Sequence, residues 1–283
     1  MRLFLIRHGE TVDNVASVYA GSLDSALTSH GVIQARLLAS HLAEHAPADT
    51  HILSSDLQRA VKTAEAIRDS RRYCAGDDEG ARQIQIVSLI REKDFGSDEG
   101  VRIGSRMPCG DSESVESMNE RVDSFLDNHI LPLCHRSSAD HGVAVVAHGI
   151  ILGVLFRRLR HRLPSGAVTS ATTDIDLSLS PSWGNTGYLE ATLSWSDSEQ
   201  EASWSAMKLV IHRINSLGHL RGLRKTRGGI GSARFDSGQR TMDSFFAPKK
   251  RKLADAPSNR PVLKYYVWKN LSNRCLKSSL NQS

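Results

Sequence analysis

The 283-residue chain is 40% hydrophobic, which suffices for the core of one large α/β domain or two small ones, and no apolar run approaches the ~18–20 residues of a membrane-spanning helix. The four scattered cysteines form no Cys-x-x-Cys pair and the N-terminus is too poor in apolar residues for a secretory signal, so we expect an intracellular protein without a zinc site or disulfide framework. The net charge of +5 hides an asymmetry, because residues 216–283 carry fifteen Lys and Arg against three Asp and Glu, whereas residues 1–215 carry 21 against 28.

Segments typical of strands and helices alternate through the first 160 residues. The apolar run at residues 3–6 predicts a buried strand, and Asp56 is expected to cap the helix that follows a strand at 51–55. The spacing of apolar residues predicts further helices at 31–45, 113–136 (at least as far as Pro132) and 150–159, and further strands at 84–89 and 143–147. Such alternation indicates an α/β fold, a three-layer αβα sandwich with a mainly parallel sheet.

The rest of the chain divides into the last part of the folded domain, up to residue 215, and a tail. Residues 161–183 are rich in Ser, Thr and Pro and predict a loop insertion. Two segments at 187–195 and 205–212 predict an antiparallel strand pair that closes the sheet. From residue 216 to 283 the apolar residues lose their periodicity, and a disordered basic tail is expected. This tail, rather than the acidic body, would contact nucleic acid or an acidic protein surface.

Two histidines follow predicted parallel strands in the same way. The strand at 3–6 leads to Arg7, His8 and Gly9, and the strand at 143–147 leads to His148 and another glycine. Each His alone is more often a satisfied structural imidazole. If the two strands are neighbours, however, both rings converge on one crevice. A cation and an imidazole beside a glycine turn suit an incoming phosphate.

Several ordered segments resemble the motifs of one family. Arg7-His8-Gly9-Glu10-Thr11, followed by Asn14, resembles the signature of the histidine phosphatase superfamily, the phosphoglycerate mutase-like proteins. Further segments similar to its second-arginine, general-acid and second-histidine motifs follow in order at residues 54–60, 89–96 and 145–149. The resemblance spans residues 1–215. It implies transfer of a phosphoryl group through a phosphohistidine, without a metal or cofactor.

The chemistry assigns a role to each matching residue. An imidazole nitrogen can attack phosphorus and hold the phosphoryl group covalently, and the resemblance gives this role to His8. It also implies that Glu92 is the acid that protonates the leaving oxygen. By composition alone Asp94, Asp98 or Glu99 could serve instead, or any of them could form a structural salt bridge.

Negative charge on the transferring group calls for cationic and hydrogen-bonding neighbours. Arg59 lies where the first turn of the helix after residue 56 is expected, a position that also favours anions. Without the resemblance, a solvated helix arginine is the ordinary interpretation of this residue. His148, if protonated, would add a further positive donor. The predicted phosphate-binding residues are Arg7, Asn14, Arg59 and His148.

The segment after Glu92 favours a phosphatase over a mutase. Mutases of this family usually have a longer, basic, Tyr-containing stretch there, and residues 93–100 lack it. Water is therefore the expected acceptor of the phosphoryl group. A mutase, and a non-catalytic adaptor that binds phosphorylated ligands, remain the alternatives. Sugar phosphates, nucleotides and phosphoproteins are all open as substrates.

Two short motifs in the tail suggest where the protein works. Residues 239–246 resemble a PIP box, the peptide that docks on the sliding clamp PCNA, with Gln239, Met242, Phe245 and Phe246 at its key positions. The aromatic pair would fill an apolar pocket of the clamp as the segment folds on binding. A basic run of Lys249, Lys250, Arg251 and Lys252 follows, which predicts recognition by a nuclear import receptor, with a merely solvated cluster as the alternative.

Overall fold

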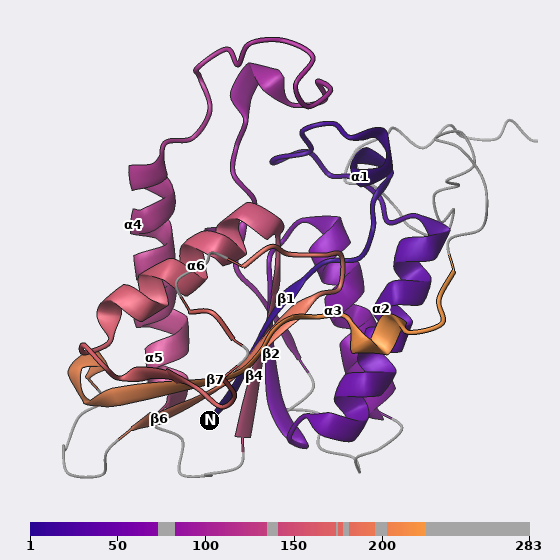
Figure 1. The fold of residues 1–283 in the computed structure, drawn as a ribbon. Coiled ribbons are helices and arrows are strands. Elements are labelled where there is room, and N and C mark those ends of the chain that lie inside the picture. Colours follow the sequence, from indigo (N-terminus) through magenta and orange to yellow (C-terminus); the bar gives the residue numbers. More distant parts are fainter. Residues whose placement is uncertain (73–82, 135–140, 174, 178–180, 196–202, 225–283) are drawn as a thin grey trace, which may run out of the picture. The chain divides into compact units, whose positions relative to one another are not determined.

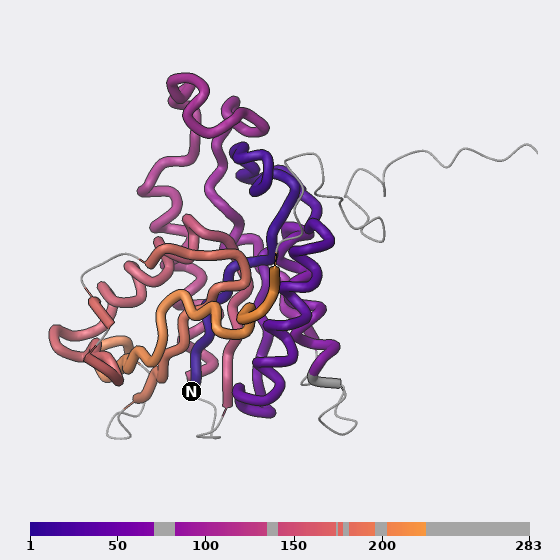
Figure 2. Tube along the Cα trace, turned by 45° about the vertical axis from the view of Figure 1, so that its right-hand side comes forward, coloured from indigo at the N-terminus to yellow at the C-terminus, as the bar shows by residue number. Residues whose placement is uncertain are grey.

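The computed structural model describes residues 1–72, 83–134, 141–173, 175–177, 181–195 and 203–224. All elements below lie in the first of two compact units, residues 1–246, whereas the second, residues 247–283, is outside the described residues. Figures 1 and 2 follow the described chain from two directions. The tail motifs at 239–246 and 249–252 also lie outside the described part, so both remain predictions.

A seven-stranded sheet forms the middle layer, in the order β3-β2-β4-β1-β6-β7-β5. Four strands, β3, β2, β4 and β1, run parallel, while β6 is antiparallel to both β1 and β7, and β5 is parallel to β7. The expected mainly parallel sheet is therefore confirmed. The strands are β1 (Arg2–Arg7), β2 (Asp49–Ser54), β3 (Ile84–Ile86), β4 (His141–Ala147), β5 (Val168–Ser170), β6 (Tyr188–Trp195) and β7 (Met207–Ser216).

Helices cover both faces of this sheet, which confirms the three-layer sandwich (Figure 1). Successive side chains of β1 point to opposite faces, so Leu3 and Leu5 join the core beneath α4 and α6, while Phe4 and Ile6 join the core beneath α2 and α3. The helices are α1 (Val12–Ala16), α2 (Ser29–His45), α3 (Gln58–Arg72), α4 (Val115–Phe125), α5 (Leu131–Cys134) and α6 (Gly149–Arg162). None of the described helices is long and apolar enough to cross a membrane.

The predicted helix at 113–136 is interrupted. After α4, the turns η4 (Leu126–Ile130) are π-helical, and α5 then contains Pro132. A proline ring inside a helix clashes with the carbonyl four residues earlier and has no N–H to donate. The wider π-helical turns accommodate both defects. The predicted strand at 84–89 is also shorter, because β3 gives way to the 3₁₀ turn η2 (Ser88–Ile90).

The N-cap expected for α3 is wrong. The Asp56 carboxylate is paired with the Arg91 guanidinium, at 2.5 Å between the closest atoms. The amide of Gln58, the first residue of α3, donates instead to Asp24 Oδ1 at 2.7 Å. A carboxylate from a distant loop thus supplies the acceptor that the local sequence was expected to provide.

Two predicted irregular segments contain structure. The loop expected at 161–183 includes the end of α6 and the edge strand β5. The body was expected to end at residue 215, yet β7 continues to Ser216 and the turn η6 (Gly218–Leu220) follows. His219 of η6 stacks on His41 of α2, with ring centroids 6.1 Å apart, so η6 packs against the body of the fold. Two further 3₁₀ turns are η3 (Gly96–Asp98) and η5 (Trp204–Ala206).

Candidate active site

Three neighbouring parallel strands end at one edge of the sheet. His8 follows β1, Ser55 follows β2 and His148 follows β4. Ligands of open α/β sheets bind at this edge, the carboxyl ends of the strands. A pocket of about 350 Å³ opens here, and its lining includes the predicted residues Arg7, His8, Asn14, Arg59 and Glu92.

His8 is held in the form that a nucleophile requires. Its Nδ1 lies 2.7 Å from the carbonyl oxygen of Gly9, and because a carbonyl only accepts, Nδ1 must carry the proton. The lone pair then resides on Nε2, which is free to attack phosphorus. The ring is only 4% exposed. Burial, and then the charges of Arg59 and Arg7, hold the His8 pKa well below 6.5, so the imidazole is neutral at physiological pH.

The backbone of the loop after β1 is fixed by neighbours on both sides. The Thr186 amide donates to the carbonyls of Arg7 and His8, both at 3.1 Å. Thr186 is fully buried and has a φ of 57°, a left-handed conformation that turns its amide toward this loop. On the other side, a Cβ on Gly9 would lie 2.6 Å from the carbonyl oxygen of Gly31 in α2, so this close approach requires glycine.

Arg59 is a buried site residue and not a solvated helix arginine. It lies in the first turn of α3 and is 1% exposed. Its two terminal nitrogens donate to the carbonyls of Leu23 and Gly21, each at 2.6 Å. Three of its five N–H groups have such partners once the Nε bond to His148 is included. Burial lowers the Arg59 pKa, whereas the charge of Glu92 opposes this shift.

His148 lies behind the pocket and is neutral in this structure. Its Nδ1 accepts from Arg59 Nε at 3.1 Å, so its proton is on Nε2, which donates to the Ser55 hydroxyl at 2.8 Å. Burial, followed by the charge of Arg59, keeps the His148 pKa well below 6.5. The positive donor that a protonated His148 would supply is therefore absent. Its ring centroid lies 5.1 Å from that of His8, and it orients Arg59.

Arg7 and Asn14 each present a donor at the pocket. Arg7 donates to the carbonyl of Trp183, while its buried Nε has no hydrogen-bond partner among the described residues. Burial lowers the Arg7 pKa and the charge of Glu92 opposes the shift. The Asn14 carboxamide oxygen accepts from the Thr11 amide and from Asn185 Nδ2. The group that Asn14 can offer to a phosphate oxygen is therefore its NH₂.

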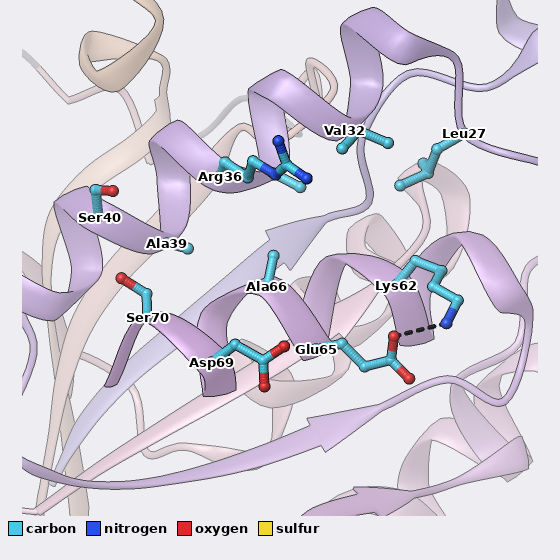
Figure 3. Close-up of a pocket in the computed structure, with 11 residues that line it drawn as sticks. Leu27, Val32, Arg36, Ala39, Ser40, Lys62, Glu65, Ala66, Asp69 and Ser70 are labelled. Carbon is cyan, nitrogen blue, oxygen red and sulfur yellow. Dashed lines mark hydrogen bonds and ion pairs between the residues drawn. The ribbon is translucent and has the colours of Figure 1, made fainter. Parts of the chain in front are cut away.

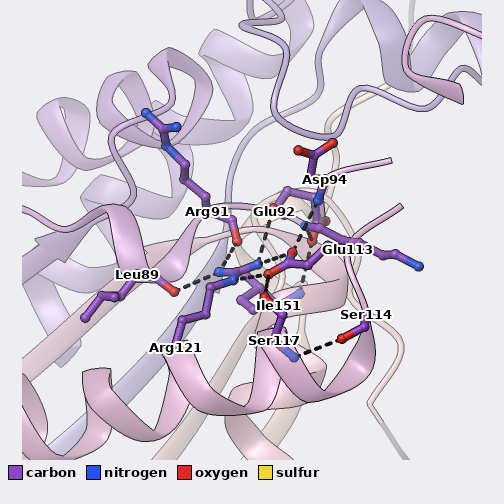
Figure 4. A network of polar contacts seen from close by, with 10 residues as sticks. Leu89, Arg91, Glu92, Asp94, Glu113, Ser114, Ser117, Arg121 and Ile151 are labelled. Carbon is purple, nitrogen blue, oxygen red and sulfur yellow. Dashed lines mark hydrogen bonds and ion pairs between the residues drawn. The ribbon is translucent and has the colours of Figure 1, made fainter. Parts of the chain in front are cut away.

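Glu92 is fixed at the N-terminus of α6. Its Oε2 accepts from the Ile150 amide and its Oε1 from the Ile151 amide, both at 3.1 Å, and Oε1 also accepts from the Lys93 amide at 2.9 Å. Figure 4 shows the surrounding polar network. The carboxylate lines the pocket, and its charge acts on both Arg7 and Arg59.

The other acidic candidates have structural roles. Asp98 pairs with Arg106, Glu99 accepts from the amide and hydroxyl of Ser22, and Asp94 accepts from the amide of Gly96. None of the three is in the described lining of the pocket. The structure therefore favours Glu92, a choice that composition did not allow.

A model of the histidine phosphatase superfamily (branch 1) matches residues 3–174. The chain belongs to this superfamily. The probable phosphoglycerate mutase GpmB of Yersinia pestis (strain Pestoides F) is 32% identical over 169 residues, which cover 56% of this chain and 74% of that protein. GpmB of Yersinia pseudotuberculosis (strain IP 31758) gives the same values.

Solved structures resemble this chain in fold. Mycobacterial hydrolase 1 has a TM-score of 0.57 at 22% identity, covering 76% of this chain and 98% of that one. A mycobacterial glucosyl-3-phosphoglycerate phosphatase in complex with VO₃ has a TM-score of 0.53 at 22% identity, covering 76% and 97%. The sequence relatives are named mutases and this structural neighbour a phosphatase, so the names alone do not choose between the two activities.

Arg121 supports the backbone of residues 89–92, here called the acid segment because it ends on the predicted acid Glu92, and was missed by the sequence analysis. Arg121 lies in α4, and its Nη1 donates to the carbonyls of Leu89 and Arg91 at 2.7 and 2.8 Å (Figure 4). Its Nη2 donates to the carbonyl of Glu92 at 3.3 Å. Glu113 holds the same guanidinium, at 2.7 Å. No local pattern indicates this role, because the partners are backbone carbonyls about 30 residues earlier in the chain.

A second pocket, of about 460 Å³, lies between α2 and α3 (Figure 3). Ala35, Ala39 and Ala66 lie along it, and Lys62 and Glu65 form an ion pair of 2.7 Å at its edge. None of the predicted site residues lines it, so the first pocket is the candidate active site. Among the described residues, no group of three or more His, Cys, Asp or Glu side chains is placed to hold a metal ion.

Proposed function

We propose that this protein is a phosphatase that hydrolyses a phosphomonoester through a phosphohistidine on His8. The observation that carries the proposal is the state of His8, a buried neutral imidazole whose Nδ1 is held by the Gly9 carbonyl and whose Nε2 has the lone pair. The buried Arg59 and the partly buried Arg7 lie beside it in one pocket. A nucleophile with adjacent cations is the requirement for phosphoryl transfer.

In the first step, His8 Nε2 forms a bond to phosphorus as the bond from phosphorus to the ester oxygen breaks. Glu92, protonated in the complex with the ester, gives its proton to that oxygen, and the alcohol leaves. Among the described residues, Oε2 of Glu92 accepts a hydrogen bond from the Ile150 amide alone, which leaves a position for this proton. The phosphorylated ring carries a positive charge, which the Gly9 carbonyl stabilises through Nδ1–H. Arg7 and Arg59 offset the negative charge on the phosphoryl oxygens.

In the second step, water attacks phosphorus and the bond to Nε2 breaks. The Glu92 carboxylate accepts the proton of the water, inorganic phosphate leaves, and His8 is neutral again. The two steps regenerate both residues and consume one water for each ester.

Water is a more suitable acceptor than a second phosphorylated intermediate. A mutase must retain a bisphosphate while it reorients, which requires cations for its second charged group. In the described lining of the pocket the only Lys or Arg side chains are Arg7 and Arg59, which serve the transferring phosphoryl group. The mutase remains the second candidate because the sequence relatives carry that name.

A phosphate-release assay over a panel of phosphomonoesters, with wild type, His8→Ala and His161→Ala, tests this proposal. His161 is an exposed histidine of α6 and serves as the matched control. We expect release by wild type and His161→Ala and none by His8→Ala. Equal release by all three would refute the covalent mechanism. Isomerisation of phosphoglycerate without net release would identify a mutase, and binding without turnover an adaptor.

We further propose that residues 239–246 bind PCNA. The support is the sequence pattern, in which Gln239, Met242, Phe245 and Phe246 fill every key position of a PIP box. Replacing both Phe245 and Phe246 by Ala should abolish binding of the full chain to purified PCNA, because the aromatic anchors are lost. Phe235→Ala, in the same tail, is the control and should bind as wild type does. Unchanged binding by the double variant would mean that the motif is accidental.

Nuclear import is proposed on the basic run that follows. Lys249, Lys250, Arg251 and Lys252 form a compact positive cluster next to the PIP-like motif. Replacing all four by Ala should move a fluorescent fusion of the full chain out of the nucleus. Replacing Lys264 and Lys269 by Ala is the control for a general loss of positive charge. An unchanged distribution of the quadruple variant would refute the import role.

A further inference from the structure

The described lining of the pocket combines two chemically different groups of side chains. One group consists of the charged or hydrogen-bonding residues described above, which include His8. The rest of the described lining is largely apolar, and its large side chains are Tyr19, Phe95, Ile103, Ile150 and Trp183. In these five side chains the polar atoms are the Tyr19 hydroxyl and the indole N–H of Trp183, and the latter lies near Gly153 of α6.

An aromatic pair forms a fixed part of this apolar wall. The rings of Tyr19 and Phe95 have centroids 4.4 Å apart and are tilted by 39°. Their segments are joined by backbone hydrogen bonds, from the Tyr19 amide to the Val101 carbonyl at 3.0 Å and from the Gly100 amide to the Tyr19 carbonyl at 2.8 Å. The wall is therefore formed before a ligand arrives, which lowers the cost of binding.

Two aliphatic side chains at the same pocket remain open to solvent. Ile103 is 54% exposed and Ile150 is 41% exposed, although both line the pocket. An exposed apolar surface that adjoins a polar site is typical of ligand binding. A ligand that covers these two side chains while its phosphate lies at His8 would remove them from water.

We infer that the pocket selects phosphomonoesters whose alcohol carries a flat apolar ring close to the phosphate, that is, aryl or arylmethyl phosphates. This inference rests on the proposed function, since it assigns a substrate class to the same site. A ring can stack against Tyr19 and Phe95 and cover Ile103. At these five large side chains, an alcohol that carries a carboxylate or several hydroxyls would lose water and find only the Tyr19 hydroxyl and the Trp183 indole N–H as polar groups.

Hydrolysis of three esters by the full chain tests the preference. Benzyl phosphate, ethyl phosphate and 3-phosphoglycerate all release alkyl alcohols, so differences among them reflect recognition more than leaving-group reactivity. We expect kcat/KM for benzyl phosphate to exceed the other two values by at least about tenfold, the scale on which apolar pockets discriminate. Equal values, or a preference for 3-phosphoglycerate, would overturn the inference while leaving the phosphatase proposal intact.

Binding of non-hydrolysable phosphonates separates the two proposals. Calorimetry with benzylphosphonate and ethylphosphonate measures the pocket's preference without turnover. At least about tenfold tighter binding of benzylphosphonate, with no ester hydrolysed, would refute the phosphatase and support the apolar specificity. Equal affinities would overturn the specificity, whatever the turnover.

Variants of the wall locate the effect. Ile103→Lys changes an exposed side chain, so it should fold, and it should lower kcat/KM for benzyl phosphate while raising that for 3-phosphoglycerate. Phe95→Ala should remove most of the preference for the benzyl ester. Met107→Ala is the matched control, since Met107 is 86% exposed and outside the described lining, and it should behave as wild type. If Ile103→Lys and Met107→Ala have the same three kcat/KM values, the wall does not select the substrate.

Discussion

At the scale of the residue, the state of two histidines determines what the site can do. His8 and His148 are close, buried and neutral, and the positive charge of the site comes from Arg7 and Arg59. The tautomers are opposite. His8 carries its proton on Nδ1 because Gly9 accepts it, and His148 carries its proton on Nε2 because Arg59 donates to Nδ1. The His8 ring thereby has the lone pair on Nε2 that the proposed mechanism requires, and the His148 ring accepts a hydrogen bond from Arg59.

This arrangement predicts a specific titration of His8. Because burial and the two arginines lower its pKa, His8 should stay neutral as the pH falls through 6.5 and become protonated only well below that value. Ring ¹⁵N spectra at neutral pH should show the Nδ1–H tautomer, with the resonance assigned by its loss in His8→Asn. Arg59→Met, which removes one of the depressing charges, should move the midpoint upward. A midpoint at or above 6.5 in wild type would contradict the structure.

Individual site residues were predictable from the sequence where they belong to a short motif. His8, Arg59 and Glu92 were named from ordered segments, and the structure brings them into one pocket. The charge of His148 was not predictable, because it depends on Arg59, which is distant in sequence. Arg121 was missed for a related reason, since backbone carbonyls leave no mark on the side-chain pattern.

At the scale of the element, the acid segment is held between two helices. The amides of α6 hold the Glu92 side chain, and Arg121 of α4 holds the backbone of residues 89–92. Burial opposes ionisation of Glu113, but its contacts with Arg121 outweigh this effect and lower the Glu113 pKa. The Glu113 carboxylate is therefore ionised at neutral pH, and it holds the Arg121 guanidinium against the backbone around Glu92.

A variant that releases residues 89–92 from Arg121 should change the phosphate-release rates in the same way as removal of the Glu92 acid. Glu92→Gln should slow release from benzyl phosphate by about 10²-fold or more, and release from p-nitrophenyl phosphate much less, because a good leaving group needs little protonation. Arg121→Met should show the same dependence on the leaving group, with a smaller loss. A purely structural defect would lower both rates equally.

Arg158→Met is the control for this experiment. Arg158 of α6 pairs with Asp123 of α4 at 2.5 Å, so its loss removes an ion pair between the two helices that hold the acid segment. It makes no contact with residues 89–92 among its hydrogen bonds in the described structure. We expect its two rates to stay within about twofold of wild type, as for a partly exposed ion pair.

The elements themselves were largely predictable, because apolar periodicity records which face each one buries. The alternation of Leu3, Phe4, Leu5 and Ile6 between two cores is an example. Ends and irregularities were less predictable, because distant contacts decide them. Asp24 caps α3 in place of Asp56, and β5 forms from a Ser/Thr-rich segment because it can pair with β7.

At the scale of the whole molecule, the turn η6 joins the rest of the fold through a cluster of aromatic and histidine rings. His219 of η6 packs against His41 and Tyr188 and bonds to the Thr186 hydroxyl at 3.0 Å. Burial, and then the charge of His41, lower the His219 pKa to about 4. The unfolded chain therefore binds a proton at this residue more readily than the folded one between about pH 6.5 and 4.

The stability of the protein should carry this signature. The contribution of His219 to the free energy of unfolding of the wild type should fall as the pH falls from about 6.5 to about 4, because protonation favours the unfolded chain in that window. His219→Gln cannot titrate, so its deficit relative to wild type should shrink as the pH falls. Urea unfolding of both proteins at pH 7, 5.5 and 4 measures the difference, and His8 and His148 cancel because both proteins contain them. A constant deficit would contradict the shift.

The family and layer order were predictable at this scale, since several ordered motifs agreed. The apolar wall of the pocket was not, because Tyr19 and Phe95 are far apart in sequence and meet only through the backbone pairing of residues 17–19 with 100–103. Substrate selection was for the same reason left open by the sequence.

The position of η6 has a consequence for any molecule that binds the tail. The Thr186 hydroxyl is hydrogen-bonded to His219, and the Thr186 amide donates to the backbone carbonyls of Arg7 and His8. A partner that displaces η6 when it binds the adjoining chain thereby disturbs the support of the nucleophile. Thermodynamic reciprocity then applies: by whatever factor that partner weakens phosphate affinity, bound phosphate weakens the partner's affinity. Binding of the partner to the tail and binding of phosphate at the site would then be thermodynamically coupled.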